Sequence, residues 1–270
     1  MLDKIITYLY GKLGIHPIIG VELEFYLRGK SSDFDLLLKQ LAQQLGALRF
    51  TINSEYGEHQ YELQTYHTEK ITQLLVNLEA AKKLMQKTAR LFNCAVDFSA
   101  KPYKTSAGSA FHAHVNLADK DMQNLFSRDS EGNVCPTLLH CIGGLCAFMK
   151  KHMLYFAPRE ESYLRYAIPD IHTPSTVSWG SNNRSAALRL PDTTLAPEKC
   201  RIEHRVSGAD CNPKAAISAI LFGILRGLEQ RISPPEKVFG IASDPQYHLE
   251  KLPLSLEEAR ELAAPLRLSF

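Results

Sequence analysis

Apolar residues recur at helical spacing in several stretches of the chain. The clearest case runs from Thr68 to Phe92, where one helical face carries Ile71, Leu74, Leu75, Leu78, Ala81 and Met85. Similar patterns predict helices over residues 1–14, 34–45, 138–157 and 214–229. Asp33 is placed to cap the second of these. From Pro234 onward, prolines and charges follow no clear period, and we expect weakly specified structure there.

Between these helices, short apolar or alternating runs predict strands. The predicted strands cover residues 17–27, 51–64 as a hairpin that turns near Gly57, 95–101, 110–117, 175–179, 186–190 and 201–206. Helices alternate with strands, but the hairpin requires antiparallel pairing. The pattern therefore favours an α+β fold with a largely antiparallel sheet covered by helices on one face.

Composition and charge mainly exclude other classes of protein. The 270 residues, 45% hydrophobic and 22% charged with a formal net charge of +2, predict one domain over residues 1–270 and no nucleic-acid partner. The first residues lack the basic and apolar regions of a signal peptide, and no apolar run reaches the ~20 residues that span a bilayer. The six cysteines form no C-x-x-C pair. We expect a cytoplasmic protein with reduced thiols and no membrane partner.

Charged residues occur where the first predicted strand should be apolar. Glu22 and Glu24 lie two apart, so both carboxylates point to one face, opposite Val21 and Leu23. Two like charges on one sheet face repel unless a cation lies between them. The pair indicates either a cation site or an exposed strand face with solvated glutamates.

Similar polar clusters occur on three later strands. Glu55 and Glu62 bracket the Gly57 turn, which could return both carboxylates to one face. His112, His114 and Asn116 alternate, and so do Arg201, Glu203 and Arg205. Each cluster has a structural alternative: an acidic hairpin tip, buried structural histidines or a salt-bridge ladder.

Together the clusters indicate more than any of them alone. Five carboxylates and an imidazole converging on one sheet would be unfavourable without divalent cations. The oxygen-rich ligand set favours Mg²⁺ or Mn²⁺, two or more, over zinc. Further arginines, Arg165, Arg184 and Arg189, suit a substrate rich in phosphate and carboxylate groups.

Eight ordered segments resemble the glutamine synthetase family. They are residues 20–26 (GVELEFY), Glu55 with 60–62 (QYE), 101–103 (KPY), 108–114 (GSAFHAH), 183–191 (NRSAALRLP), 201–205 (RIEHR), 209–213 (ADCNP) and 252–259 (LPLSLEEA). The resemblance implies a curved antiparallel sheet with helices outside. It also implies two metal sites, the first held by Glu24, Glu55 and Glu62 and the second by Glu22, His112 and Glu203.

The same resemblance assigns substrate positions. ATP phosphates would be held by Arg184, Arg189 and Arg201, with His114 and Asn116 near the nucleotide. Glutamate would be held by Arg165, Arg205 and the backbone of Gly108. His172 stands where the family has a flap glutamate, with Asp170 close by, and Ala107 replaces an asparagine. Arg184, Arg205 and His172 are the candidate catalytic residues.

The implied reaction is ATP-dependent. Glutamate would be phosphorylated to γ-glutamyl phosphate, and ammonia or another amine would then displace the phosphate. By this resemblance the sequence corresponds to the family's catalytic domain, and we expect the β-grasp domain that precedes it in the family to be absent and the C-terminal part to be short. We therefore expect either a homo-oligomer or a separate chain that supplies the missing domain. The alternatives are an impaired ATP- and metal-binding pseudoenzyme, a regulatory partner of a full-length synthetase, or a globular protein with exposed charged strands.

Overall fold

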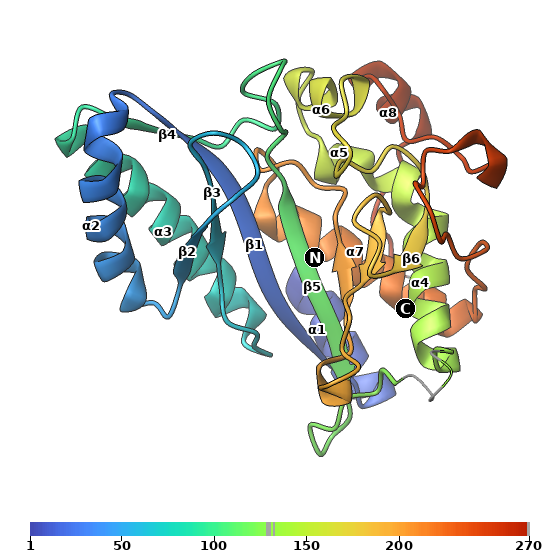
Figure 1. Ribbon diagram of the computed structural model, residues 1–270. Helices are drawn as coiled ribbons and strands as arrows, with labels where there is room; N and C mark the ends of the chain where they lie inside the picture. The colour runs from blue at the N-terminus through green and yellow to red at the C-terminus, as the bar shows by residue number, and fades with distance from the viewer. Residues whose placement is uncertain (128–130, 132, 269–270) are drawn as a thin grey trace.

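The computed structural model describes residues 1–127, 131 and 133–268, and a curved sheet runs through its centre (Figure 1). The sheet has eight strands in the order β2-β3-β1-β5-β8-β7-β6, and β4 also pairs with β1. The strands are β1 (His16–Arg28), β2 (Thr51–Ser54), β3 (Gln60–Gln64), β4 (Ala95–Asp97), β5 (Phe111–Ala118), β6 (Trp179–Ser181), β7 (Leu188–Leu190) and β8 (Ile202–His204). Within the described residues, every strand pairing except β6 with β7 is antiparallel, which confirms the predicted fold class.

Helices cover the back of the sheet in Figure 1 and leave the front of β1 and β5 open. The helices are α1 (Leu2–Leu13), α2 (Phe34–Gly46), α3 (Ile71–Leu91), α4 (Pro136–Met149), α5 (Met153–Phe156), α6 (Leu164–Ala167), α7 (Pro213–Gln230) and α8 (Leu256–Leu262). The β1 residues Val21, Leu23 and Phe25 are buried in the hydrophobic core, as their alternation predicts. No helix in the described ranges combines the length and the apolar character that a membrane crossing requires.

Most predicted elements form within a few residues of their expected bounds, and the differences have local causes. The predicted helix over 138–157 is interrupted by a 3₁₀ turn at Lys150–His152. The strand predicted to reach Lys101 ends at Asp97. Asp33 occupies the N-cap position of α2, but its side chain makes no capping hydrogen bond.

The strand predicted over 175–179 is wrong, because β6 begins only at Trp179. The preceding residues pair instead with the C-terminal part of the chain: Val177 N donates to Glu250 O at 2.8 Å and Leu252 N to Ser175 O at 2.9 Å. A contact so distant in sequence leaves no local pattern. The segment after Pro234 is thus tied to the sheet region by backbone hydrogen bonds.

Candidate active site

Strand register brings the predicted polar residues onto the open face of the sheet. Glu24 on β1 lies opposite Glu62 on β3, and Glu22 lies opposite His112 on β5. One strand further, His114 pairs with Glu203 on β8. Because side chains alternate along each strand, all of these residues share one face.

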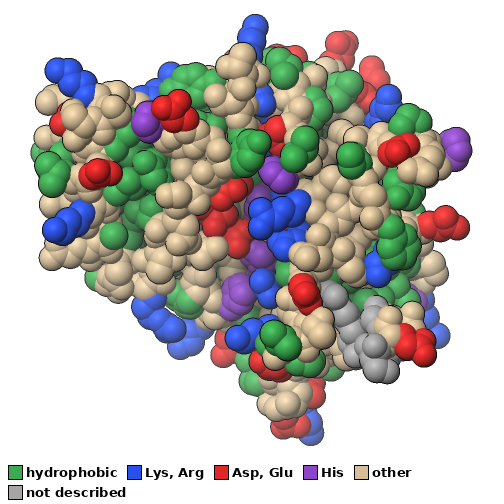
Figure 2. Space-filling view, in the orientation of Figure 1, with side chains coloured by type: hydrophobic (Ala, Val, Ile, Leu, Met, Phe, Trp, Pro, Cys, Tyr) green, Lys and Arg blue, Asp and Glu red, His purple; other side chains and the backbone are tan. Residues whose placement is uncertain are grey.

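A pocket opens on this face, and acidic, arginine and histidine side chains gather in the hollow of Figure 2. Predicted site residues that line it are Glu22, Glu24, Glu55, Glu62, Gly108, His112, Arg165, His172, Arg184, Arg189, Glu203 and Arg205. Asp170, Ala107, Tyr56 and Gln60 also contribute. His114, Asn116 and Arg201 do not line the pocket.

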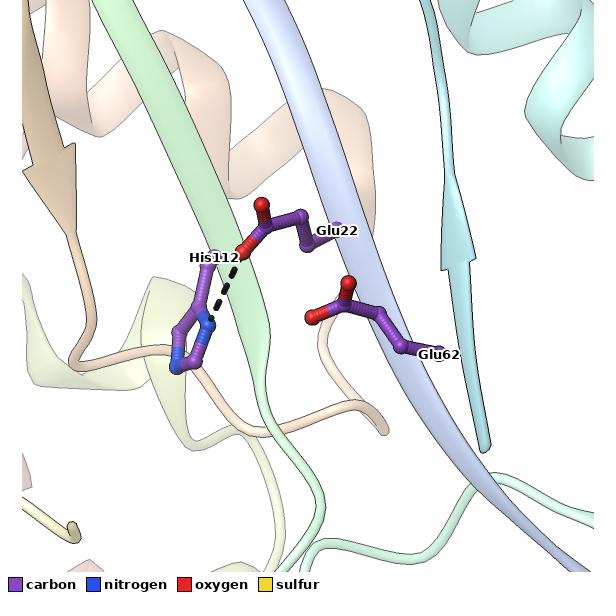
Figure 3. Close-up of side chains that lie close together, drawn as sticks. All are labelled: Glu22, Glu62 and His112. Carbon is purple, nitrogen blue, oxygen red and sulfur yellow. Dashed lines mark ion pairs between the residues drawn. The ribbon is translucent and has the colours of Figure 1, made fainter. Parts of the chain in front are cut away.

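Two groups of side chains have ligand atoms close enough to hold a metal ion. In the first, Glu22, Glu62 and His112 point toward one another, with the ligand atoms within 4.8 Å (Figure 3). In the second, Glu22, His114 and Glu203 meet the same limit. Glu22 therefore belongs to both groups and His114 joins one, whereas the family resemblance divides the ligands differently. The expected assignment of three ligand residues to each of two metal sites stays a prediction.

Two of the carboxylates, Glu24 on β1 and Glu62 on β3, are destabilised in their charged form. Burial raises the pKa of Glu24 to about 7, although Arg165 and the Ala110 N–H act in the opposite direction. The pKa of Glu62 is raised by burial and then by neighbouring carboxylates, first Glu22 and then Glu24. Negative charge has accumulated here beyond what nearby cationic groups of the protein offset.

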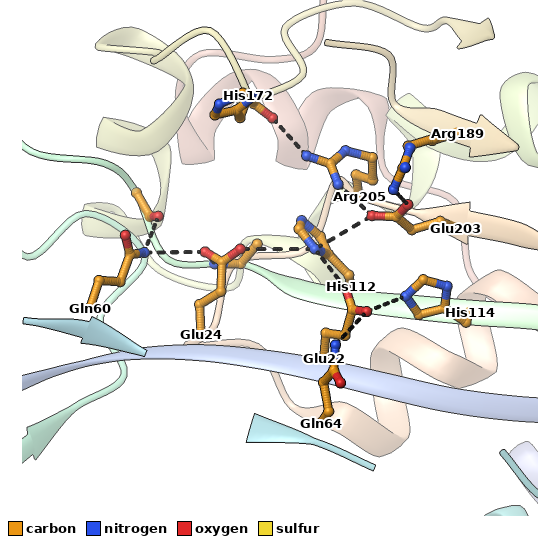
Figure 4. Close-up of polar contacts among 12 residues, drawn as sticks. Glu22, Glu24, Gln60, Gln64, His112, His114, His172, Arg189, Glu203 and Arg205 are labelled. Carbon is orange, nitrogen blue, oxygen red and sulfur yellow. Dashed lines mark hydrogen bonds and ion pairs between the residues drawn. The ribbon is translucent and has the colours of Figure 1, made fainter. Parts of the chain in front are cut away.

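Glu203 has the opposite environment. Its side chain is 1% exposed, and its two oxygens contact Arg205 and Arg189, the latter at 2.8 Å (Figure 4). Burial alone would raise the pKa of Glu203, but Arg205, His112, His114 and Arg189 lower it to about 2. This carboxylate is fixed and ionised.

The donor set fits a divalent cation that prefers oxygen. Glu22 and Glu62 offer carboxylate oxygens, and His112 turns its Nδ1 toward the carboxylates, 3.5 Å from Glu22 Oε2. A cation here would offset the repulsion among these carboxylates and would accept a ligand nitrogen from the imidazole. Carboxylates with one imidazole suit Mg²⁺ or Mn²⁺ better than zinc.

Beside the pocket, a row of polar side chains extends from Glu22 toward the edge of the site. His114 Nε2 lies 2.9 Å from Glu22 Oε1, and Arg201 Nε donates to His114 Nδ1 at 3.0 Å. His67, which was not predicted, lies near His114 with the two rings tilted and their centroids 5.8 Å apart. His67 lies in a loop and belongs to no helical or strand periodicity, so its position could not be predicted from the sequence pattern. Asn116 is half-buried further along β5.

Two side chains brace the floor of the pocket. Arg165 is 2% exposed and donates to Val206 O at 2.7 Å and to Arg205 O at 3.2 Å. Gln60 Nε2 donates to Glu24 Oε2 at 3.3 Å and to Gly108 O at 2.9 Å. Gln60 was not predicted, although it lies two residues before Glu62 on the same strand face.

The loop 168–174 closes one side of the pocket. Asp170 accepts hydrogen bonds from Gly108 N at 3.0 Å and from His172 N at 2.8 Å. Arg205 donates to His172 O at 3.2 Å. Burial lowers the pKa of His172, Asp170 opposes this, and Arg205 and Arg184 add to it. The imidazole is therefore neutral near pH 7 and able to accept a proton.

This arrangement can hold and transfer an anionic group. Acidic residues for cations lie on one side, and the guanidinium groups of Arg184, Arg189 and Arg205 line the same pocket. Arg184 is exposed at the surface of the pocket and offers a planar donor fork for a phosphate. Such a combination is typical of sites that handle phosphate with divalent cations.

Comparison with known proteins agrees with this chemistry. The family model described as "Glutamine synthetase, catalytic domain" matches residues 31–264. The chain is 31% identical over 260 residues to the gamma-glutamylputrescine synthetase of Escherichia coli (strain K12), covering 84% of this chain and 54% of that protein. It is 28% identical over 287 residues to the glutamine synthetase of Pyrococcus abyssi (strain GE5 / Orsay), covering 96% and 64%.

A solved structure gives the same architecture. The chain superimposes on GmaS in complex with ADP with a TM-score of 0.85 at 24% identity, covering 97% of this chain and 66% of that one. At this identity the likeness shows the fold alone. The chain spans about half to two thirds of the length of these proteins.

Proposed function

The chain belongs to the glutamine synthetase family through its catalytic domain, and on that premise we propose that it is an ATP-dependent ligase joining the γ-carboxylate of glutamate to an amine. The observation that carries the proposal is the convergence of five carboxylates and His112 on a pocket that arginines also line. The relatives include both a gamma-glutamylputrescine synthetase and a glutamine synthetase, so the amine is open.

We propose that the six residues Glu22, Glu24, Glu55, Glu62, His112 and Glu203 hold the cations, with His114 as a further ligand beside Glu22. When bound, the divalent cations would offset charge on the ATP phosphates and on the attacking carboxylate. Arg189 and Arg205 are themselves oriented by Glu203, so their remaining donors are fixed in direction. This is electrostatic and positional catalysis.

The substrate contacts are proposed on the same basis. Arg184, Arg189 and Arg201 would hold phosphate groups, with His114 and Asn116 beside the nucleotide. Arg165, Arg205 and the Gly108 backbone would hold glutamate. In the second step, the neutral His172 would accept the proton that the amine loses, because its ring lies on the pocket wall.

The test measures phosphate release from ATP in the presence of Mg²⁺, glutamate and either ammonia or hydroxylamine. We expect glutamate-dependent release that hydroxylamine increases, because this amine is largely neutral at pH 7 and needs no carboxylate to attract it. Arg184→Lys keeps the charge but loses the planar fork, and should raise the KM for ATP about tenfold. Arg90→Lys, on the exposed side of α3, is the matched control and should change nothing.

Two results would contradict the proposal. Phosphate release that is independent of glutamate would identify a different phosphoryl acceptor. Binding of ATP and Mg²⁺ with no turnover by any amine, measured as a rise in melting temperature, would instead favour an impaired, nucleotide-binding relative of the family.

A further inference from the structure

The mouth of the pocket differs in chemistry from its floor. Tyr56, directly after Glu55 in the β2–β3 turn, lines the pocket yet is 72% exposed. Across from it, His172 lines the pocket from the loop 168–174, and the neighbouring Ile171 is 71% exposed. The two rings meet edge to face, with centroids 5.4 Å apart and an interplanar angle of 80°. Two segments distant in sequence thus form one aromatic wall.

This wall is held in place on its loop side. The His172 backbone is fixed at its N–H by Asp170 and at its carbonyl by Arg205. Asp170 is fixed in turn by Gly108 N, so the loop is anchored to the segment that leads into β5. A side chain anchored in this way presents a preformed surface, which lowers the entropy cost of binding.

Charges at the mouth disfavour a second cationic group on the amine. Two carboxylates line the pocket near the wall: Asp170 directs both oxygens at backbone N–H groups, and Glu55 is one of the proposed cation ligands. Arg184 and Arg205 contribute positive charge next to His172. A second ammonium group at this position would need an uncommitted carboxylate, whereas an aromatic ring edge to face with an imidazole favours contact with an apolar substituent, which ammonia lacks.

We propose that the second substrate is a primary monoamine with an apolar alkyl or aryl substituent, which packs against Tyr56 and His172. The inference rests on the proposed ligase function and names its amine. The amine nitrogen bonds to the acyl carbon of γ-glutamyl phosphate, and the bond from that carbon to the phosphate oxygen breaks, with the electron pair leaving on phosphate. The nitrogen gives its surplus proton to His172 or to water.

The experiment compares kcat/KM for butylamine, benzylamine, 1,4-diaminobutane and ammonia in the presence of ATP, Mg²⁺ and glutamate. We expect butylamine or benzylamine to exceed both ammonia and the diamine by at least about tenfold, the discrimination that an apolar contact of this size provides. Tyr56→Ala should lower the ratio of butylamine to ammonia about tenfold, and Tyr56→Phe should preserve it.

Tyr10 supplies a matched control. It is 58% exposed on α1 and also meets a histidine ring edge on, His16, with centroids 4.6 Å apart. Tyr10→Ala should leave the ratio unchanged. A direct readout is the imidazole NMR signal of His172, assigned with His172→Gln, which butylamine should shift in the native protein and not in Tyr56→Ala.

The outcomes separate this inference from the proposed function. If no amine, including hydroxylamine, supports glutamate-dependent phosphate release, the ligase proposal fails first. If turnover occurs but ammonia or the diamine is preferred, the ligase stands and the monoamine inference is overturned. If Tyr56→Ala changes the oligomeric state in size-exclusion chromatography and leaves the amine ratio intact, the wall is an interface between chains and the inference is overturned as well.

Discussion

At the scale of single residues, Glu203 shows how one carboxylate can organise a site. It is 1% exposed and joins Arg189 to Arg205, which would otherwise be two nearby cations in a poorly solvated pocket. The sequence indicated the alternation of Arg201, Glu203 and Arg205, but it could not show that the paired arginine on β7 would be Arg189. That contact comes from the β7–β8 register.

Removing the charge of Glu203 should therefore be costly. Glu203→Gln keeps the shape of the side chain but leaves the buried guanidinium of Arg205 and its neighbour Arg189 without their anion. The free energy of unfolding, measured in urea, should therefore fall by about 3–5 kcal/mol. Glu250→Gln is the control, because the Lys150–Glu250 pair is solvent-exposed, with Glu250 at 73%. We expect that change to cost at most about 1 kcal/mol. Equal costs for both variants would show that Glu203 carries no special electrostatic role.

At the scale of elements, the sequence predicts helices and strands that follow a local pattern better than it predicts contacts between segments distant along the chain. The period in residues 71–91 predicts α3, and the alternation around Glu22 and Glu24 predicts both β1 and the face that carries the site. α8 was missed although its signal is local: Ser255 Oγ accepts from Glu258 N, and Glu258 accepts from Leu254 N. The β6 bounds were wrong for a different reason, since the competing partner lies some 75 residues away along the chain.

The same contrast applies to the candidate site. Glu22, Glu24, Glu62, His112 and Glu203 are detectable because charge on a strand face violates the expected apolar pattern. The contacts of the loop 168–174 depend on how it folds back over the start of β5, which no periodicity encodes. Residues on strands could therefore be proposed from the sequence, and the geometry that joins them to loop residues could not.

Two helix glycines give a prediction at this scale. In α4, a Cβ on Gly144 would lie 2.1 Å from Gly223 O and 2.6 Å from Gly227 Cα of α7. Gly144→Ala should therefore force the two helices apart and destabilise the protein by about 1–3 kcal/mol. A Cβ on Gly11 in α1 would meet nothing within 4 Å, so Gly11→Ala should stabilise by about 0.5–1 kcal/mol. Chemical denaturation of both variants checks the difference, and a neutral Gly144→Ala would show that the α4–α7 crossing is adaptable.

At the scale of the whole molecule, the pocket links folding stability to pH and to divalent cations. The pKa of Glu24 is raised from 4.5 to about 7 and that of Glu62 is raised too, so the folded state binds these protons more tightly than the unfolded state does. The contribution of these protonated carboxyl groups to the free energy of unfolding is complete below about pH 4.5 and is lost as pH rises through the folded-state pKa. A cation that replaces those protons stabilises more as pH rises.

We therefore expect the rise in melting temperature caused by millimolar Mg²⁺ to grow steadily between pH 5.5 and pH 8. Differential scanning fluorimetry with and without the ion measures it at each pH, and buried histidines outside the site, such as His152, contribute equally to both curves. Glu62→Gln should flatten the dependence, because its amide has no proton to release. A Mg²⁺ effect that is constant or declines with pH would contradict the assignment of these carboxylates.

The order of the strands along the chain has a consequence for synthesis on the ribosome. β1 and β5 can pair early, but β8, which covers the other edge of β5, ends only at His204. At about 5–20 residues per second, the edge of β5 stays unpaired for roughly 5–20 seconds after it has been made. An unpaired strand edge is a template for pairing with a neighbouring chain. Polysomes that carry several growing copies would thus be most exposed to misassembly in this interval, and a chaperone that binds extended strands would act there.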